Sequence, residues 1–216
     1  MFNFIPYKEY TGAENMSIDE GILEKAICEQ MKTPTFRLYG WKPACVSLGR
    51  NQADKFIDTD FLKSNNIDVV RRLTGGRALL HDNEITYSFV CPSSYLKHGD
   101  NVTKSYIEIS NILIEKFKKI GIELTFGGAK SVNTKFDYCM LISTGADLCY
   151  KGKKFIGSAQ CRKQGYILQH GSILYDYDKE LLEKIFHEKV DTSEITSFKE
   201  INSKMSKEHL LEILSE

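Results

Sequence analysis

Several residue types are scarce in this chain, and each shortage excludes a class of protein. Proline occurs four times and tryptophan once among 216 residues. No apolar run approaches the ~20 residues that a membrane-spanning helix needs. The first seven residues, MFNFIPY, have neither the charged start nor the long apolar core of a signal peptide. We therefore expect a cytoplasmic protein with no membrane partner.

An excess of charge of one sign is also missing. Lysine and arginine together number 29, and so do aspartate and glutamate, so no net charge points to nucleic acid as a partner. Six cysteines are too few for a disulfide-stapled fold of this length, and they show neither a C-x-x-C pair nor zinc-site spacing. We expect no metal site and no cofactor, and a cysteine with a function should be a nucleophile.

The length and composition are those of one globular domain. Hydrophobic residues make up 42% and charged residues 27% of the chain, which is ordinary for an enzyme-sized core. We expect a single domain over residues 1–216, and a monomer. Cys28 and Cys45 lie in apolar runs, so we expect them in the core, and we expect Cys91, which ends a strand, in the core or at a strand edge.

Hydrophobic periodicity predicts a chain of mixed helices and strands. The expected helices are residues 15–31, 60–64, 102–120, 177–186 and 204–214. The expected strands are residues 2–7, 34–39, 44–49, 67–70, 85–90, 147–150, 154–162 and 166–174. The pair 34–39 and 44–49 is expected to form a hairpin with Trp41 at its turn as a packing anchor, and the last three strands a meander.

One stretch, VVRRLTGGRALLH at residues 69–81, carries more chemistry than its surroundings. Arginines precede Gly75 and Gly76, where the missing Cβ atoms allow a sharp turn and close approach to a ligand. A plain hairpin with a glycine turn explains the same pattern, and the spacing matches neither a P-loop nor a dinucleotide fingerprint. By itself the stretch indicates an acyl or anionic ligand.

Two further motifs accompany it. The segment KFIGSAQCR at residues 154–162 is followed by LQHGSIL at 168–174, and the pattern W-x-P-x-x-x-S-x-G-x-x-Q covers residues 41–52. In this order the three motifs resemble the biotin/lipoate protein ligase superfamily. Arg77 stands where many members have a third glycine, which resembles the LipM-like octanoyltransferase branch. The resemblance implies an α+β fold, with a mixed, largely antiparallel sheet and helices packed mainly on one face.

The resemblance also implies a nucleophile. LipM-like transferases place a catalytic cysteine upstream of the motif lysine, at a separation that Cys139 and Lys154 share. Cys139 lies in a polar loop, and Lys154 would favour its thiolate. Met140 stands where an aromatic residue is more usual, and a partly buried loop thiol is the plain alternative. Asp147-Leu148 echoes a ligase sequence, so an ATP-dependent ligase stays open.

As the resemblance implies it, the activity is octanoyl transfer from octanoyl-acyl carrier protein to a lysine of a lipoyl domain, foremost the glycine cleavage H protein, through a thioester on Cys139. The residues expected to bind substrate are Arg72, Thr74, Gly75, Gly76, Arg77, His81, Ser158, His170 and Gly171. His81 or His170 could be a general base or a structural histidine. An amidotransferase between lipoyl domains, a lipoate ligase and a non-enzymatic binding module are the rival hypotheses.

Overall fold

Two sheets organise the chain in a computed structural model, which describes residues 2–128, 145, 147–187 and 189–216. The larger sheet has the order β1 (Asn3–Tyr10), β2 (Thr35–Trp41), β6 (Glu84–Pro92), β10 (Tyr166–Leu174), β9 (Lys153–Lys163), β8 (Leu148–Tyr150) and β7 (Thr125–Phe126). Only the β1–β2 pair of this sheet is parallel. The mixed, largely antiparallel sheet is thereby confirmed.

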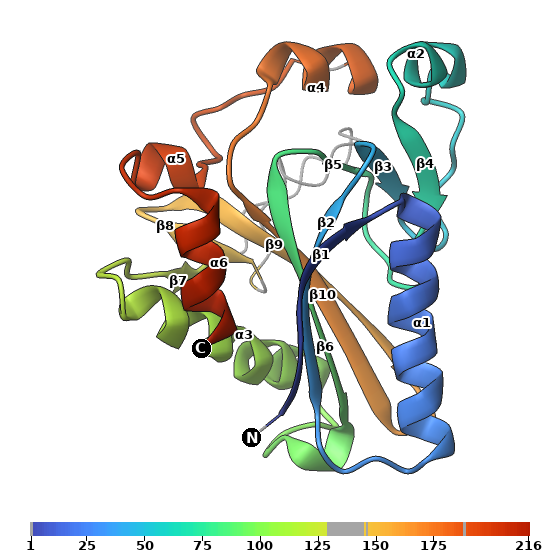
Figure 1. The fold of residues 1–216 in the computed structure, drawn as a ribbon, viewed down its shortest axis with the longest axis vertical. Helices are drawn as coiled ribbons and strands as arrows, with labels where there is room; N and C mark the ends of the chain where they lie inside the picture. Colours follow the sequence, from blue (N-terminus) through green and yellow to red (C-terminus); the bar gives the residue numbers. More distant parts are fainter. Residues whose placement is uncertain (1, 129–144, 146, 188) are drawn as a thin grey trace.

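A smaller sheet contains the middle of the chain. It has the order β4 (Asp68–Arg71), β3 (Cys45–Leu48) and β5 (Leu79–His81), with β3 parallel to β4 and antiparallel to β5. Figure 1 shows this sheet beside the first helix, and β4 contacts that helix. Because β3 separates β4 from β5, the stretch with the two glycines joins two strands that do not pair and is no hairpin.

Helices lie on both faces of the larger sheet and beside the smaller one. They are α1 (Gly12–Cys28), α2 (Thr59–Ser64), α3 (Val102–Lys118), α4 (Lys179–Phe186), α5 (Phe198–Ile201) and α6 (Lys207–Ser215). Of these, α2 and α4 pack with the smaller sheet. Figure 1 shows α1 on one side of the sheet and α3 with α6 on the other. The expectation of helices mainly on one face is wrong, because helices cover both faces of the sheet (Figure 1): all nine residues of β6, which alternate between the two faces, are buried.

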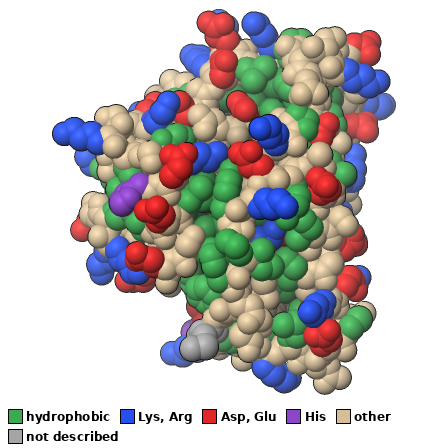
Figure 2. All heavy atoms as spheres, viewed as in Figure 1, with side chains coloured by type: hydrophobic (Ala, Val, Ile, Leu, Met, Phe, Trp, Pro, Cys, Tyr) green, Lys and Arg blue, Asp and Glu red, His purple; other side chains and the backbone are tan. Residues whose placement is uncertain are grey.

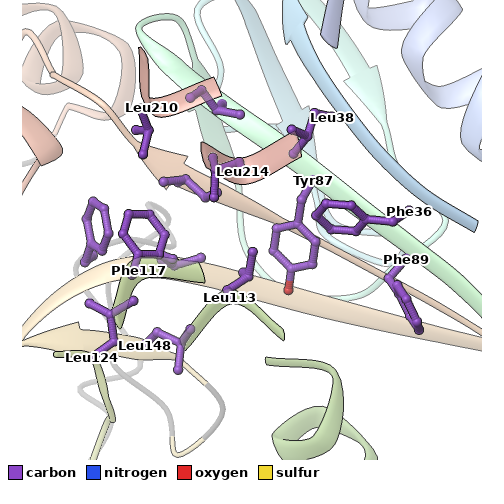
Figure 3. Close-up of a cluster of buried hydrophobic side chains, with 14 of the residues drawn as sticks. Phe36, Leu38, Tyr87, Phe89, Leu113, Phe117, Leu124, Leu148, Leu210 and Leu214 are labelled. Carbon is purple, nitrogen blue, oxygen red and sulfur yellow. The ribbon is translucent and has the colours of Figure 1, made fainter. Parts of the chain in front are cut away.

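The main core forms where α3 and α6 cover the sheet. Figure 3 shows this cluster with side chains from the sheet and from both helices, among them Phe36, Tyr87, Leu113, Phe117, Leu210 and Leu214. On the opposite face, Leu23 and Ala26 of α1 pack against Val90 and Leu168. Figure 2 shows hydrophobic side chains at the centre of one molecular face, with charges of both signs around them.

Local sequence signals account for the helix limits. The Thr11 hydroxyl accepts a hydrogen bond from the Glu14 N–H, and the Glu14 carboxylate accepts one from Thr11, so a capping box begins α1 three residues before the expected start. Asn101 caps α3, which begins at the expected residue. None of the described helices is both long and apolar enough to cross a membrane.

Two other expectations are wrong. Strands β2 and β3 form no hairpin, because β1 and β6 occupy both edges of β2. Cys28 is exposed at the end of α1, whereas Cys45 and Cys91 are buried as expected. The expected meander is confirmed: β8, β9 and β10 are antiparallel neighbours.

Candidate functional site

A cavity of about 530 Å³, mouth included, lies between residues of the two sheets and α1. Six of the residues expected to bind substrate line it: Arg72, Gly76, His81, Ser158, His170 and Gly171. Its other lining residues are Met16, Tyr39, Trp41, Ser47, Leu79, Thr86, Gly157, Ala159 and Ser172. The structure thus brings the three sequence motifs together around one cavity.

Arg72 fixes the loop that carries the two glycines. Its guanidinium donates hydrogen bonds to the carbonyl oxygens of Ser47, Gly75 and Arg77, at 2.9, 2.9 and 2.7 Å. The side chain is 7% exposed, so these charge-assisted bonds form away from bulk water. Arg72, Gly75 and Arg77 therefore have their clearest role in shaping the loop.

Glycine is required at the loop for two geometric reasons. Gly76 has φ +97°, which side chains rarely adopt. A Cβ atom on Gly49 would lie 1.8 Å from the Gly76 carbonyl oxygen, so the loop packs directly on the end of β3. Gly171 makes a similar approach across the cavity, where a Cβ atom would lie 2.5 Å from the Gly157 carbonyl oxygen.

His170 belongs to a fully connected polar chain. Its Nδ1 lies 3.3 Å from Asp19 Oδ2, and its Nε2 lies 2.7 Å from Thr74 Oγ1. Asp19 also accepts hydrogen bonds from Arg37, Tyr39 and Ser88, at 2.7, 2.8 and 2.9 Å. Burial alone would raise the pKa of Asp19, but the hydrogen bond from His170 and the charge of Arg37 outweigh it and lower the pKa.

His81 belongs to a second, incomplete chain. Its Nε2 lies 2.8 Å from Ser47 Oγ, and its Nδ1 lies 3.4 Å from Glu84 Oε1. The imidazole stacks on Trp41 with ring centroids 4.0 Å apart. Burial lowers the pKa of His81 although Glu84 opposes the shift, so the ring is neutral near pH 7.

Lys154 is placed away from these histidines. Its ammonium forms an ion pair with Asp147, with Nζ 3.1 Å from Oδ2, and both side chains are almost fully buried. Lys154 shares β9 with Gly157, which lines the cavity. Cys139 lies outside the described residues, so the distance between its thiol and Lys154 is not defined.

Sequence reasoning missed several residues at the cavity. Ser47 lines the cavity, and Asp19, which bonds to the cavity residue His170, is 1% exposed on the buried side of α1. A carboxylate among buried helix positions is the signal that could have marked Asp19. Trp41 was expected only as a packing anchor, and it both packs on Tyr39 and lines the cavity.

The polar groups that line the cavity include those of arginine, histidine, serine and threonine side chains and of the backbone. Over the part of the chain that the structure describes, no three histidine, cysteine or carboxylate side chains are grouped to hold a metal ion. Arginine, histidine and hydroxyl groups around glycine-lined walls can instead orient a carbonyl group and leave room for a slim apolar chain.

Comparison with known proteins identifies relatives of the chain. The model of the lipoyl protein ligase A/B catalytic domain family matches residues 11–216. Octanoyltransferase LipM of Clostridioides difficile (strain 630) is 41% identical over 186 residues, which are 84% of this chain and 68% of that protein. Octanoyltransferase LipM of Geobacillus kaustophilus (strain HTA426) is 40% identical over 182 residues, 81% and 65% of the two chains. The chain spans about two thirds of the length of these curated relatives.

Solved structures share the fold. Lipoate-protein ligase A bound with ATP superposes with a TM-score of 0.76 at 21% identity, covering 99% of this chain and 83% of that one. A bi-partite lipoate protein ligase from Thermoplasma acidophilum, solved in a study of that ligase and its E2 lipoyl domain, gives 0.73 at 20% identity, covering 99% and 81%.

Proposed function

The chain belongs to the lipoyl protein ligase A/B catalytic domain family, and we propose that it is an acyltransferase that carries out octanoyl transfer in protein lipoylation. The observation that carries the proposal is the 41% identity to an octanoyltransferase over 84% of the chain. The ligases with the same fold are only about one fifth identical. We therefore base the proposed reaction on the transferases and not on the ligases.

The proposed donor is octanoyl-acyl carrier protein, and the proposed acceptor is a lysine of a lipoyl domain, foremost the glycine cleavage H protein. The Thermoplasma ligase, which shares this fold, was solved in a study that included its E2 lipoyl domain. A protein acceptor is compatible with a cavity of this size, because only the octanoyl chain has to lie inside it.

The proposed nucleophile is Cys139. Its thiolate attacks the thioester carbonyl of the donor, the donor thiol leaves, and an enzyme thioester forms in a nearly balanced exchange that needs no ATP. The amine of the acceptor lysine then attacks this thioester, the carbon–sulfur bond to Cys139 breaks, and an amide forms while a proton of the amine passes to the departing sulfur. Lys154 supplies positive charge near the reacting atoms, and Asp147 fixes its ammonium 3.1 Å away.

The acyl chain is proposed to lie in the cavity between Gly76 and Gly171. Both positions lack a Cβ atom where the backbone approaches its neighbours closely, so the walls can close around a methylene chain. Ser158 lies across the same space, where its hydroxyl is 2.8 Å from Tyr87 OH. Arg72 keeps the glycine loop in one conformation while substrate enters.

Intact-mass analysis after incubation with octanoyl-acyl carrier protein, without ATP, tests the proposal. The wild-type protein should gain one octanoyl group on the peptide that contains Cys139, and Cys139→Ser should lose transfer to the lipoyl domain by orders of magnitude while it remains folded. Normal transfer by a folded Cys139→Ser protein contradicts the thioester route.

The same assay separates the rival reactions. Transfer that requires ATP and releases AMP indicates a lipoate ligase. Transfer that proceeds only from an octanoylated lipoyl domain, and not from the carrier protein, indicates an amidotransferase. Binding of a lipoyl domain without any acyl transfer indicates a binding module.

A further inference from the structure

Three side chains at the cavity are arranged like a nucleophile with its base and carboxylate. Ser47 lines the cavity at β3, and its Oγ lies 2.8 Å from His81 Nε2. On the far side of the imidazole, Nδ1 lies 3.4 Å from Glu84 Oε1. A hydroxyl, an imidazole and a carboxylate in this order define an activated serine, and such contacts are often long in unliganded enzymes.

Arg72 determines the direction of the hydrogen bonds in this chain. Its Nη1 donates to Ser47 Oγ at 3.1 Å, and a guanidinium cannot accept a hydrogen bond. The Ser47 hydroxyl is then free to donate its proton to His81 Nε2, which leaves the imidazole proton on Nδ1, facing Glu84. This tautomer lets a neutral histidine act as a base for the hydroxyl.

Unsatisfied atoms mark the same place. Over the described part of the chain, three buried side-chain atoms have no hydrogen-bond partner: His81 Nδ1, Glu84 Oε2 and Ser172 Oγ. When the His81 ring gains a proton, it becomes positively charged opposite the Glu84 carboxylate. Because both side chains are buried, a hydrogen bond between them then becomes favourable. Ser172 lines the cavity, where its hydroxyl can donate to a carbonyl oxygen of a ligand.

We propose that Ser47, His81 and Glu84 form a second acyl-transfer centre, which takes medium-chain acyl groups from thioesters or esters and releases them to water as free acids. The inference rests on the proposed function to the extent that an acyl group has to enter this cavity. It assigns a hydrolytic activity, and with it a way to clear an acyl group that has not reached an acceptor lysine.

Each step of this activity balances. Ser47 Oγ attacks the acyl carbonyl carbon while its proton passes to His81 Nε2; the carbon–sulfur bond breaks, and that proton moves to the departing sulfur. Water then attacks the serine ester and gives a proton to His81, the ester bond breaks, and the proton returns to Ser47 Oγ. The Arg72 guanidinium lies where it can stabilise negative charge near Ser47 Oγ.

The other histidine chain does not offer the same chemistry. Thr74 Oγ1 lies 2.7 Å from His170 Nε2, but Thr74 does not line the cavity, whereas Ser47 does. Of the two hydroxyls that contact a histidine here, Ser47 is therefore the one that can reach a ligand in the cavity.

The experiment uses the Cys139→Ala protein and p-nitrophenyl octanoate, an activated ester. Intact mass should increase by one octanoyl group, and peptide mapping should place the group on Ser47. An ester on serine resists neutral hydroxylamine, which cleaves a thioester. Glu84→Gln in the same background should slow p-nitrophenolate release by about a hundredfold or more, because the imidazole loses the carboxylate that stabilises its charged form.

Two further variants keep the result interpretable. Cys139→Ala with Ser47→Ala should take up no acyl group, and Ser47→Cys should give an adduct that neutral hydroxylamine removes. Ser88→Ala is the matched control, because this buried strand serine bonds to Asp19 and lies outside the cavity lining; its labelling should equal that of Cys139→Ala alone.

The outcomes separate this inference from the proposed function. Transfer to a lipoyl domain by the wild-type protein, together with no label or a label elsewhere than Ser47 in Cys139→Ala, overturns only the second centre. A label on Ser47 without any transfer by the wild-type protein overturns only the proposed function.

Discussion

Two carboxylate–histidine–hydroxyl chains border one cavity, and they differ in how completely they are satisfied. Asp19 receives hydrogen bonds from Arg37, Tyr39 and Ser88 in addition to His170. In the other chain, Glu84 Oε1 accepts from Thr86 while Oε2 has no partner within the described residues. A network in which every polar atom is hydrogen-bonded holds its side chains in one arrangement. A network with unbonded atoms can form a further hydrogen bond when one of its groups gains a proton.

The satisfied chain joins parts of the molecule that are distant in sequence. Asp19 is on α1, Arg37 on β2, Ser88 on β6 and His170 on β10. Its loss would leave Arg37, which is 1% exposed, as a buried charge without its counter-charge. This chain is a structural element with one histidine at the cavity, and the Glu84 chain is the reactive element.

The largest expected effect is on stability, and it comes from a substitution in the hydrogen-bonded Asp19 chain. Asp19→Asn should lower the free energy of unfolding by about 3–5 kcal/mol, because it leaves the Arg37 guanidinium uncompensated. Glu84→Gln should cost less than about 1.5 kcal/mol, since one carboxylate oxygen has no bond to lose. Urea unfolding of both variants provides the measurement.

An exposed ion pair is the control for that experiment. Lys163 and Glu24 are paired at the surface, so Glu24→Ala should change the free energy of unfolding by less than about 1 kcal/mol. Equal losses for Asp19→Asn and Glu84→Gln would show that the two chains have the same structural weight.

A third buried carboxylate, Asp147, pairs with Lys154, and this lysine is expected to affect the reactivity of Cys139. Lys154→Met should slow formation of the acyl-enzyme roughly ten- to a hundredfold. The loss is limited to this range because a cysteine thiol with its ordinary pKa of ~8.5 is still a few per cent thiolate near pH 7. Lys154→Arg should keep part of the rate. The measurement is the pH dependence of iodoacetamide labelling at Cys139; identical titration in wild type and Lys154→Met would mean that Lys154 does not tune the thiol.

The glycine loop offers a way to disturb the cavity between the two chains. Gly76→Val should cost about 1–3 kcal/mol of stability, because valine is strained at φ +97°. It should also reduce acyl loading by narrowing the wall, as measured by intact mass. Gly152→Val, at a distant turn with φ +82°, controls for the backbone strain; loading that is lost equally in both variants would point to misfolding.

The smallest effect is on the pH dependence of stability. Burial lowers the pKa of His81, so below about pH 6.5 the unfolded chain binds a proton that the folded protein does not, and stability falls as the pH falls. Asp19, whose pKa is lowered despite its burial, contributes stability that is present above about pH 4 and is lost only below it.

Thermal unfolding between pH 7.5 and 5 tests that difference. His81→Gln should flatten the decline between pH 7 and pH 5.5 and leave the acid limb below pH 4 in place. A decline of unchanged slope in His81→Gln would assign the titration to another group.

From the amino-acid sequence alone, three motifs predicted the family, and hydrophobic periodicity predicted most of the helices and strands. These features are local: a capping box at Thr11, a stripe of apolar residues on α3, and a glycine pair with its flanking arginines all act within a few residues. The β8–β10 meander followed from the same short-range patterns, whereas the α+β class was implied by the resemblance of the three motifs to a known superfamily.

Only the tertiary structure decided which strands and side chains meet. Strand β3 leaves its expected hairpin because both edges of β2 are occupied, and pairing depends on free edges rather than on nearness in sequence. Asp19 reaches His170 across 151 residues, and Ser47 reaches His81 across 34. A buried charge or imidazole needs hydrogen-bond partners, and the fold supplies them from distant parts of the chain. A local sequence pattern therefore cannot predict which residues they are.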